Sequence, residues 1–497
     1  MTTTTPDPPL DTARHIRYWQ RCLRTLLPHH YTANDSTRLT IGYFVLAALD
    51  LLSSPSSFSA EPPANPLAAS LIPAQDRPGI RAWILSLQHP EGGFCGSPHH
   101  VLPAAYQTEW TAAATTTTKK NSNGTSDKTH APPPPPPTHR DPENANIAAT
   151  YFALLALGVL ADDDGARAFA RVDRLKTLRW LRRLQREDGS FGENVDRDGY
   201  VAGGRDMRPC YLAATIRWVL GGAEAGPEVD FDVGKLVTHI RRSQAFDGGI
   251  AESSMHESHA GYAYCAVAAL SLLDQANPDP SASPTHYLEA GIPSIPALIH
   301  FLVSRQFAYQ DTSSSGSSTP DPDAASSGGD GPPDLSSLSI SPPNGDGITG
   351  FNGRLNKAAD TCYVWWVGGT LCLLGQGGLV DRAPARRFLL EKTEHVIGGF
   401  AKHPGGPPDI YHAYLGLAAL ATMAGAEAGA GGKGGENAGG EEKKSSGKEE
   451  GLGQFDPRLC VGAEAAERIR RGREALLAPA RPPTPEDSDG SSADEDE

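Results

Sequence analysis

Apolar stretches recur along the chain, and each one follows a short turn that contains glycine. The turns share one pattern, in which a helix end, often with Gln, leads into glycine and then an aromatic or aliphatic residue. Their sequences are "LSLQHPEGGFCG" (85–96), "RRLQREDGSFGE" (182–193), "RRSQAFDGGIAE" (241–252), "SRQ" with "GITGFNG" (304–306 and 347–353) and "KTEHVIGGFAK" (392–402). Glycine adopts the left-handed conformation that ends a helix, and the Ala-rich stretches that follow favour helix formation. The pattern therefore predicts a repeated helix-turn-helix unit.

The stretches after the turns are apolar on almost every side, which predicts that the second helix of each pair is buried. They lie at 146–160, 208–220, 259–273, 360–374 and 411–423. When residues 99–143 and 309–347 are set aside as insertions, the turns recur about every 50 residues, a period typical of repeat architectures. Five or six such hairpins can stack as an open solenoid or close into a ring. No terminal repeat has the polar face of a cap, so we expect an all-α fold, an α-α barrel with inner and outer helices.

Low-complexity segments interrupt this domain. Apolar residues make up only 39% of the 497 residues, a low fraction for a packed chain of this length. Segments rich in Thr, Ser, Gly, Pro, Glu and Lys account for the shortfall, because they cannot bury enough apolar surface to become ordered. We therefore expect one barrel domain at 1–475, interrupted at about 99–143, 309–347 and 424–452, and an acidic disordered tail at 476–497.

Charge and composition exclude several classes of protein. The net charge of −15 and the absence of a basic stripe argue against a nucleic-acid partner. The longest uncharged apolar run, 363–375, is too short to span a bilayer, and the N-terminus has no secretion-signal pattern. Seven cysteines without regular spacing indicate reduced thiols rather than a disulfide framework. These features predict a cytoplasmic protein without stable membrane insertion.

Residues with chemical potential gather directly after the glycine turns. In a ring, the inner helices all begin at one rim of the central cavity, so residues at these starts converge there. Asp360, Cys362 and His412 are all possible zinc ligands, and catalytic zinc sites combine three protein ligands with one open position. Asp360 and Cys362 are two positions apart and can reach one metal only where the helix is not yet regular. Spacing alone leaves open that Cys362 is a core residue and that His412 is merely hydrogen-bonded.

A second set of residues at the same junctions is cationic. Charges beside apolar segments are costly unless they meet an anion. These cationic side chains either form structural ion pairs with Asp206, Asp360 or Asp409, or line a pocket for a polyanion such as a diphosphate. The set consists of Arg208, His259, Arg354, Lys357 and Lys402.

One apparent metal motif does not hold, and four cysteines are not candidate ligands. "HESH" (256–259) has its histidines three apart rather than four, which excludes the zinc-protease helix motif. Cys22, Cys95, Cys372 and Cys460 have no second ligand nearby in the sequence, and we expect them to be core or surface thiols.

Three segments carry a resemblance to a known family. "GRLNKAADTCYVWW", "HESHAGYAYCAVAAL" and "PDIYHAYLGLAAL", within residues 36–423, resemble the β subunits of protein prenyltransferases, most closely the type I geranylgeranyltransferase branch. The resemblance implies an α-α barrel enzyme that transfers a C20 group from geranylgeranyl diphosphate to the thiol of a C-terminal Cys-aliphatic-aliphatic-X (CaaX) motif. It also implies an obligate heterodimer with a helical-repeat α subunit, and acceptors such as small GTPases, with X usually Leu.

The resemblance assigns roles to individual residues. Asp360, Cys362 and His412 would bind one Zn²⁺, which makes the acceptor thiol nucleophilic. His259, Arg354, Lys357 and Tyr363 are similar to diphosphate-binding residues, and Arg208 to a residue that holds the C-terminus of the peptide. The residues that would line the prenyl channel are Tyr211, Tyr262, Cys265 and Trp366.

Three positions bear on donor length and metal use. Thr40 stands where farnesyltransferases carry a Trp that blocks the end of the channel, so space for one more isoprene unit is expected. Leu415 replaces the Phe usual in the geranylgeranyl branch. Lys402 stands where farnesyltransferases carry an Asp that recruits magnesium, and its ammonium group can supply the same charge. Magnesium is therefore not expected to be required.

Alternatives come from inside and outside the family. A farnesyltransferase β subunit is disfavoured by Thr40 and Lys402, and a Rab geranylgeranyltransferase β subunit by Lys402 and "PDIYHAY". Terpene cyclases of this shape carry an Asp-rich "DxDD" motif that is absent here. A non-catalytic binding module would not need Asp360, Cys362 and His412 together.

Overall fold

The computed structural model describes most of the chain outside the low-complexity segments. Most of the predicted insertions at 99–143, 309–347 and 424–452, and of the predicted tail at 476–497, lie outside the described residues. The described residues are 8–32, 35–53, 70–99, 144–162, 165–196, 198–277, 281, 283–310, 347–430 and 451–478.

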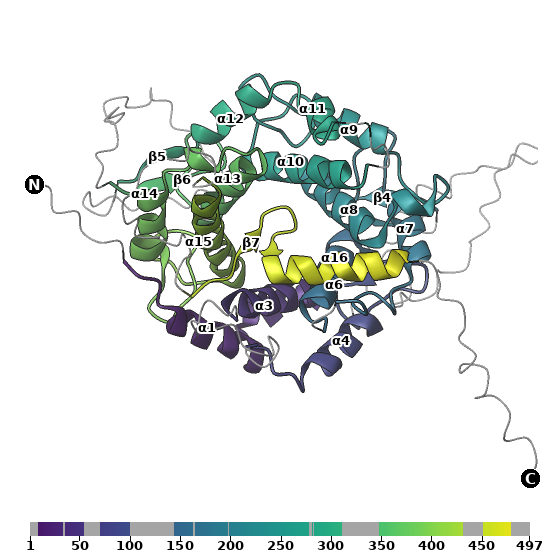
Figure 1. Ribbon diagram of the computed structural model, residues 1–497, viewed down its shortest axis with the longest axis horizontal. Coiled ribbons are helices and arrows are strands. Elements are labelled where there is room, and N and C mark those ends of the chain that lie inside the picture. Colours follow the sequence, from purple (N-terminus) through teal and green to yellow (C-terminus); the bar gives the residue numbers. More distant parts are fainter. Residues whose placement is uncertain are drawn as a thin grey trace, which may run out of the picture.

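Six inner helices form a closed ring, each packed against the next, and the last against the first. Figure 1 shows this ring from one end, with shorter helices around it. The α-α barrel predicted from the repeat is confirmed. The inner helices are α3 (Arg38–Leu52), α6 (Ile147–Val159), α8 (Met207–Leu220), α10 (Ala260–Gln275), α13 (Thr361–Leu373) and α15 (Ile410–Ala430).

An outer helix precedes each inner helix, and short elements connect them. The outer helices are α1 (Thr12–Arg24), α4 (Arg77–Ser86), α7 (Arg174–Arg183), α9 (Val233–Arg242), α12 (Ile295–Val303) and α14 (Arg382–Arg387), the last continuing as a π-helix, η9 (Phe388–Thr393). The connections include the short helices α2 (His29–Thr32), α11 (His286–Gly291), η1 (Asp35–Thr37), η5 (Ala223–Ala225) and η8 (Gly377–Leu379). Three antiparallel strand pairs also lie between helices: β1 (Phe94–Cys95) with β2 (Ala145–Asn146), β3 (Asn194–Val195) with β4 (Val201–Ala202), and β5 (Gln306–Ala308) with β6 (Thr349–Phe351).

The glycine turns join one repeat to the next. Gly189 and Gly248 have φ values of 89° and 88°, which glycine adopts without steric cost. A Cβ atom at Gly189 would lie 2.0 Å from the carbonyl oxygen of Lys235, in the next outer helix. At Gly398 the corresponding contact, at 2.7 Å, is with the carbonyl oxygen of Arg14 in α1. Because that contact joins the last repeat to the first, the same turn that builds the repeat also closes the ring.

The recurring Gln explains the other half of the sequence pattern. The side-chain oxygen of Gln185 accepts a hydrogen bond of 2.9 Å from the backbone of Asp232, the N-cap of α9. Gln244 does the same for Ser294, at 2.8 Å. Each Gln thus holds the start of the following outer helix. The same bond occurs between Gln88 and Asp173 and between Gln306 and Asp381.

A C-terminal segment crosses the open centre of the ring. Strands β7 (Phe455–Asp456) and β8 (Val461–Gly462) pair as a hairpin that enters the ring, and α16 (Ala463–Leu477) lies across one end (Figure 1). A Cβ atom at Gly158 in α6 would lie 2.2 Å from Ile469, so glycine allows α16 to pack closely there. One predicted boundary is wrong, because α15 continues to Ala430, beyond the expected start of the insertion at 424. The sequence "AGAEAGA" is Ala-rich and extends the helix.

All seven cysteines are free, as expected from their irregular spacing. Within the described residues, no helix combines the length and apolar content needed to cross a membrane.

Candidate functional site

Asp360, Cys362 and His412 lie together where α13 and α15 begin. One potential ligand atom from each lies within 4.8 Å of the other two. Asp360 is the N-cap of α13, with ψ of 136°, and its carboxylate accepts a hydrogen bond of 2.8 Å from the backbone of Cys362. Its extended backbone frees Asp360 from helical spacing. This is how two residues only two positions apart reach the same point.

His412 is held between two carboxylates. Its Nδ1 atom lies 2.6 Å from Oδ2 of Asp409, and its Nε2 atom lies 3.3 Å from Oδ1 of Asp360. Burial opposes protonation, but the hydrogen bonds to Asp360 and Asp409 raise the pKa of His412 to about 9. Asp409 therefore fixes the ring so that Nε2 faces Asp360 and Cys362. Orientation of a histidine by a second carboxylate is typical of metal sites.

The donor set fits a divalent zinc ion. Burial, and then the neighbouring Asp360 carboxylate, raises the pKa of Cys362 well above the ordinary thiol value. A thiolate at this position therefore requires a strong positive charge beside it. Carboxylate, thiolate and imidazole are all zinc ligands, and three of them leave one position open.

A histidine and a tyrosine lie beside this cluster. His259 is the N-cap of α10, and its Nδ1 atom accepts a hydrogen bond of 3.0 Å from the backbone of Gly261. Burial, and then Arg354 and Arg208, lowers the pKa of His259 to about 4. The neutral ring therefore carries its proton on Nε2 and donates to the hydroxyl of Tyr363, 2.9 Å away. Burial raises the pKa of Tyr363, so that its own proton remains available to an anion.

Of the side chains predicted as cations, His259 is neutral at physiological pH, because burial lowers its pKa to about 4. The other four have different settings. Arg354, which is partly exposed, pairs with the exposed Glu257 at 3.0 Å. Glu257 belongs to the "HESH" segment, where it meets a guanidinium rather than a metal. Arg208 makes two hydrogen bonds to the Asp206 carboxylate, at 2.8 and 2.9 Å. The structural ion pair considered for Arg208 is therefore present.

Lys357 and Lys402 are both exposed on loops next to α13. Asn352 fixes the first loop, because its side chain donates a hydrogen bond of 2.9 Å to the carbonyl of Lys357. The carbonyl of Lys402 accepts a bond of 3.0 Å from the backbone of Thr361, the first residue of α13. The Lys402 charge also acts to lower the pKa of Cys362, against the larger effect of burial. Each backbone contact fixes the main chain that carries an exposed lysine side chain.

The residues predicted for the prenyl channel lie on five inner helices, within the first two turns. Tyr262 stacks obliquely against His259, with ring centroids 4.8 Å apart. Trp366 contacts Tyr264 at 5.0 Å. These contacts place Tyr262 against the N-cap residue of α10 and Trp366 against the same helix. The set consists of Thr40 on α3, Tyr211 on α8, Tyr262 and Cys265 on α10, Trp366 on α13 and Leu415 on α15.

Two structural features were not predicted from the sequence. One is Asp409 as a partner of His412, which the N-cap position of Asp409 before "IYHAY" could have indicated. The other is the C-terminal hairpin inside the ring, together with the tyrosines that bind it. An aromatic residue recurs near the start of every inner helix, and this was a signal in the sequence.

Comparisons with known proteins agree with this architecture. Residues 10–461 match the family described as prenyltransferase alpha-alpha toroid domain. The geranylgeranyl transferase type-1 β subunit of Arabidopsis thaliana is 27% identical over 410 residues, covering 82% of this chain and 84% of that protein. The farnesyltransferase β subunit of Pyricularia oryzae is 30% identical over 307 residues, covering 56% and 49%.

A solved structure is similar to nearly the whole chain. It is described as Candida albicans protein geranylgeranyltransferase-I complexed with GGPP, and it matches with a TM-score of 0.60 and 22% identity. The match covers 93% of this chain and 99% of that one. At this identity, the likeness establishes the fold.

Proposed function

Because the chain belongs to the prenyltransferase alpha-alpha toroid domain family, we propose that it is the catalytic β subunit of a type I protein geranylgeranyltransferase. The observation that carries the proposal is the convergence of Asp360, Cys362 and His412, within 4.8 Å, next to His259 and Tyr363. A candidate thiol-binding metal site and a donor for phosphate oxygens then lie together where α10, α13 and α15 begin. The Arabidopsis and Candida relatives are named as type I enzymes.

Asp360, Cys362 and His412 would hold the Zn²⁺. A zinc ion there would supply the positive charge that favours the deprotonated form of an acceptor thiol. Asp409 orients His412 for this purpose. The acceptor is the Cys of a C-terminal CaaX sequence, as in small GTPases that end in Leu. Arg208 is available to the carboxylate end of that peptide.

The other rim residues act on the leaving group. As the bond between sulfur and C1 of geranylgeranyl diphosphate forms, the bond between C1 and oxygen breaks and the diphosphate departs with its electron pair. His259 holds Tyr363 with its hydroxyl proton free for a phosphate oxygen. Arg354, Lys357 and Lys402 offset the growing charge. Lys402 would take the place of a magnesium ion.

The proposal includes a heterodimer with an α subunit, because the relatives are named as β subunits. The sequence has no segment that reads as an α subunit, so that subunit would be a separate chain. The acidic composition of the chain suits acceptors with a basic region upstream of the motif.

Farnesyl transfer is the second candidate. The Pyricularia farnesyltransferase β subunit is 30% identical over about half of the chain, compared with 27% for the Arabidopsis type-1 geranylgeranyl transferase β subunit. Thr40 and Lys402 favour the C20 donor, as argued from the sequence.

The test uses the chain co-expressed with candidate α subunits. Purified heterodimer is analysed for zinc and is then offered C15 and C20 diphosphates in competition, with peptides ending in Leu or Ser. We expect one zinc ion per heterodimer and preference for the C20 donor with the Leu peptide. Cys362→Ala should abolish both zinc binding and transfer, whereas Cys372→Ala, a matched control at the far end of α13, should retain both. Transfer by Cys362→Ala at the parent rate would refute the proposal.

A further inference from the structure

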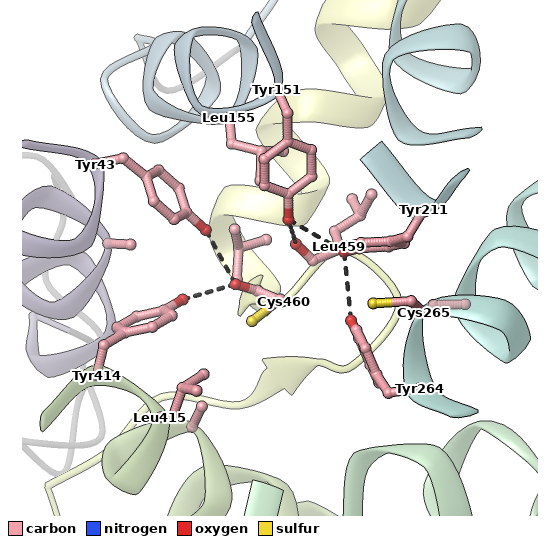
Figure 2. Close-up of a cluster of buried hydrophobic side chains, with 14 of the residues drawn as sticks. Tyr43, Tyr151, Leu155, Tyr211, Tyr264, Cys265, Tyr414, Leu415, Leu459 and Cys460 are labelled. Carbon is pink, nitrogen blue, oxygen red and sulfur yellow. Dashed lines mark hydrogen bonds between the residues drawn. The ribbon is translucent and has the colours of Figure 1, made fainter. Parts of the chain in front are cut away.

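The hairpin inside the ring ends in four residues, Pro457 to Cys460, which we call the tip. The tip joins strands β7 and β8. Figure 2 shows it surrounded by side chains from the inner helices. Leu459 and Cys460 are its apolar members and are buried, with 2% and 9% of their surface exposed.

Five tyrosines hold the tip by its backbone. Each of the four tip carbonyls accepts a hydrogen bond from at least one tyrosine hydroxyl. Figure 2 shows the bonds to Leu459 and Cys460. Burial raises the pKa of all five tyrosines well above the usual value, so their hydroxyls remain protonated donors. The pairs are Tyr264 to Pro457 at 2.8 Å, Tyr211 to Arg458 at 3.0 Å, Tyr151 to Leu459 at 3.5 Å, and Tyr43 and Tyr414 to Cys460 at 3.1 and 2.7 Å.

The five tyrosines are equivalent in the repeat. Each tyrosine is the fifth residue of the inner helix on which it lies, except Tyr43, which is the sixth residue of α3. The corresponding residue of α13 is Trp365. Trp365 packs against Phe455 at the base of the hairpin, with centroids 6.3 Å apart. We call Tyr43, Tyr151, Tyr211, Tyr264 and Tyr414 the tyrosine girdle. The repeated tyrosines therefore form a binding site for the backbone of the tip.

The girdle fixes how far the tip lies from the rim. The rise of an α-helix is about 1.5 Å per residue, so five residues place the girdle roughly 7–8 Å below the helix starts that carry Asp360 and His259. An extended C20 chain is much longer than this. A prenyl chain with its diphosphate at the rim must therefore turn where it meets the tip and continue along it.

Residues already assigned to the prenyl channel adjoin the tip. Tyr211 bonds to it directly, and Trp366 contacts Tyr264 of the girdle. In Figure 2 the Cys265 sulfur points toward the tip, and Leu415 follows Tyr414 of the girdle on α15. We propose that the tip, through Leu459 and Cys460, is the surface against which the far end of the prenyl donor lies, and that it therefore sets donor length. This inference rests on the function proposed above.

The first test changes the volume of the tip. The backbone of Cys460 has φ of 56°, which glycine adopts freely, so Cys460→Gly removes the side chain without backbone strain. We expect it to raise the ratio of kcat/KM for the C20 over the C15 donor, and we expect Cys460→Phe to lower that ratio by about tenfold or more. Cys22→Phe is the matched control, because Cys22 is a free thiol on the outer helix α1 and its substitution should leave the ratio unchanged.

The second test uses the unaltered heterodimer and does not depend on how a variant folds. A C20 diphosphate that carries a diazirine on its last isoprene unit is bound and irradiated, and the labelled peptides are sequenced by mass spectrometry. We expect labelling at Leu459 or Cys460, competed by geranylgeranyl diphosphate. Labelling confined to other segments, or a donor ratio unchanged in Cys460→Gly, would overturn the role of the tip. If the parent heterodimer transfers no prenyl group, it is the proposed function that fails.

Discussion

The imidazole of His412 is bound on its Nδ1 side by the carboxylate of Asp409, at 2.6 Å, and this contact aims its other nitrogen at the predicted metal position. Asp409 precedes α15 and also accepts a hydrogen bond of 2.9 Å from the backbone of His412. One side chain therefore both begins the helix and orients the ring.

Asp409→Asn should weaken zinc binding by about 10- to 100-fold, the usual effect of losing a carboxylate behind a metal-bound histidine. Zinc affinity is measured by competition with a chelating dye. Asp173→Asn is the control, because Asp173 caps α7 in the same manner on the outer ring. Equal zinc affinity in both variants would contradict the role assigned to Asp409.

His259 should make stability depend on pH. Its pKa is about 4 in the folded chain and 6.5 as an ordinary histidine. Between these values the unfolded chain binds more protons, so the contribution of His259 to stability is present above about pH 6.5 and is lost as the pH falls toward 4. His259→Asn retains an N-cap acceptor without a titrating ring. We expect urea midpoints of the parent to fall more steeply than those of His259→Asn between pH 6.5 and 5, and parallel curves would refute this.

Lys402→Asp should create a requirement for magnesium. The parent is expected to transfer its prenyl group in buffer freed of magnesium, since the ammonium supplies the charge. The variant should lose about tenfold or more in kcat without magnesium and recover on its addition. Lys392→Asp, on the outer ring, provides a charge-matched control. A strict magnesium requirement in the parent would contradict the assignment of Lys402.

Thr40→Trp should shift donor preference toward the C15 diphosphate. Filling the space of one isoprene unit removes burial worth about 0.8 kcal/mol per CH₂ group, so several kcal/mol of C20 binding are at stake. The C15 to C20 ratio of kcat/KM reports the shift. Thr40→Val, which retains the shape of Thr, should leave that ratio near the parent value.

Tyr43 and Tyr414 should be coupled in stability. Both donate to the carbonyl of Cys460, so either alone can satisfy it. Each Tyr→Phe substitution should cost about 1 kcal/mol of unfolding free energy, whereas the double variant should cost more than the sum, because the buried carbonyl then has lost both hydroxyl donors. Strict additivity in urea unfolding would show that the two bonds act independently.

The barrel was predictable because short sequence patterns mark each of its repeats. Glycine at 189, 248 and 398 and Gln at 185 and 244 each serve a contact that recurs between neighbouring repeats. The meeting of Asp360, Cys362 and His412 was expected only once the ring placed all inner helix starts at one rim. Neither spacing nor composition alone brings residues 50 apart to within 4.8 Å.

The hairpin inside the ring was not predictable by the same means. Residues 451–462 have no periodic pattern, and their bonds to the girdle are made by backbone carbonyls, which every sequence possesses. The recurring tyrosines were visible, but a buried tyrosine on an apolar helix is usually read as core. The hydroxyls of Tyr43, Tyr151, Tyr211 and Tyr264 bind acceptors more than 190 residues away in the sequence.

The hairpin also bears on how a newly synthesised chain matures. The six inner helices described above leave the ribosome before residues 451–462 do, so the girdle hydroxyls must stay hydrated until this hairpin arrives. A chain truncated before this hairpin would leave the girdle hydroxyls inside the ring without their carbonyl acceptors. Ring assembly is therefore completed only after residues 451–462 have been synthesised, and quality-control proteases should remove chains truncated before residue 451.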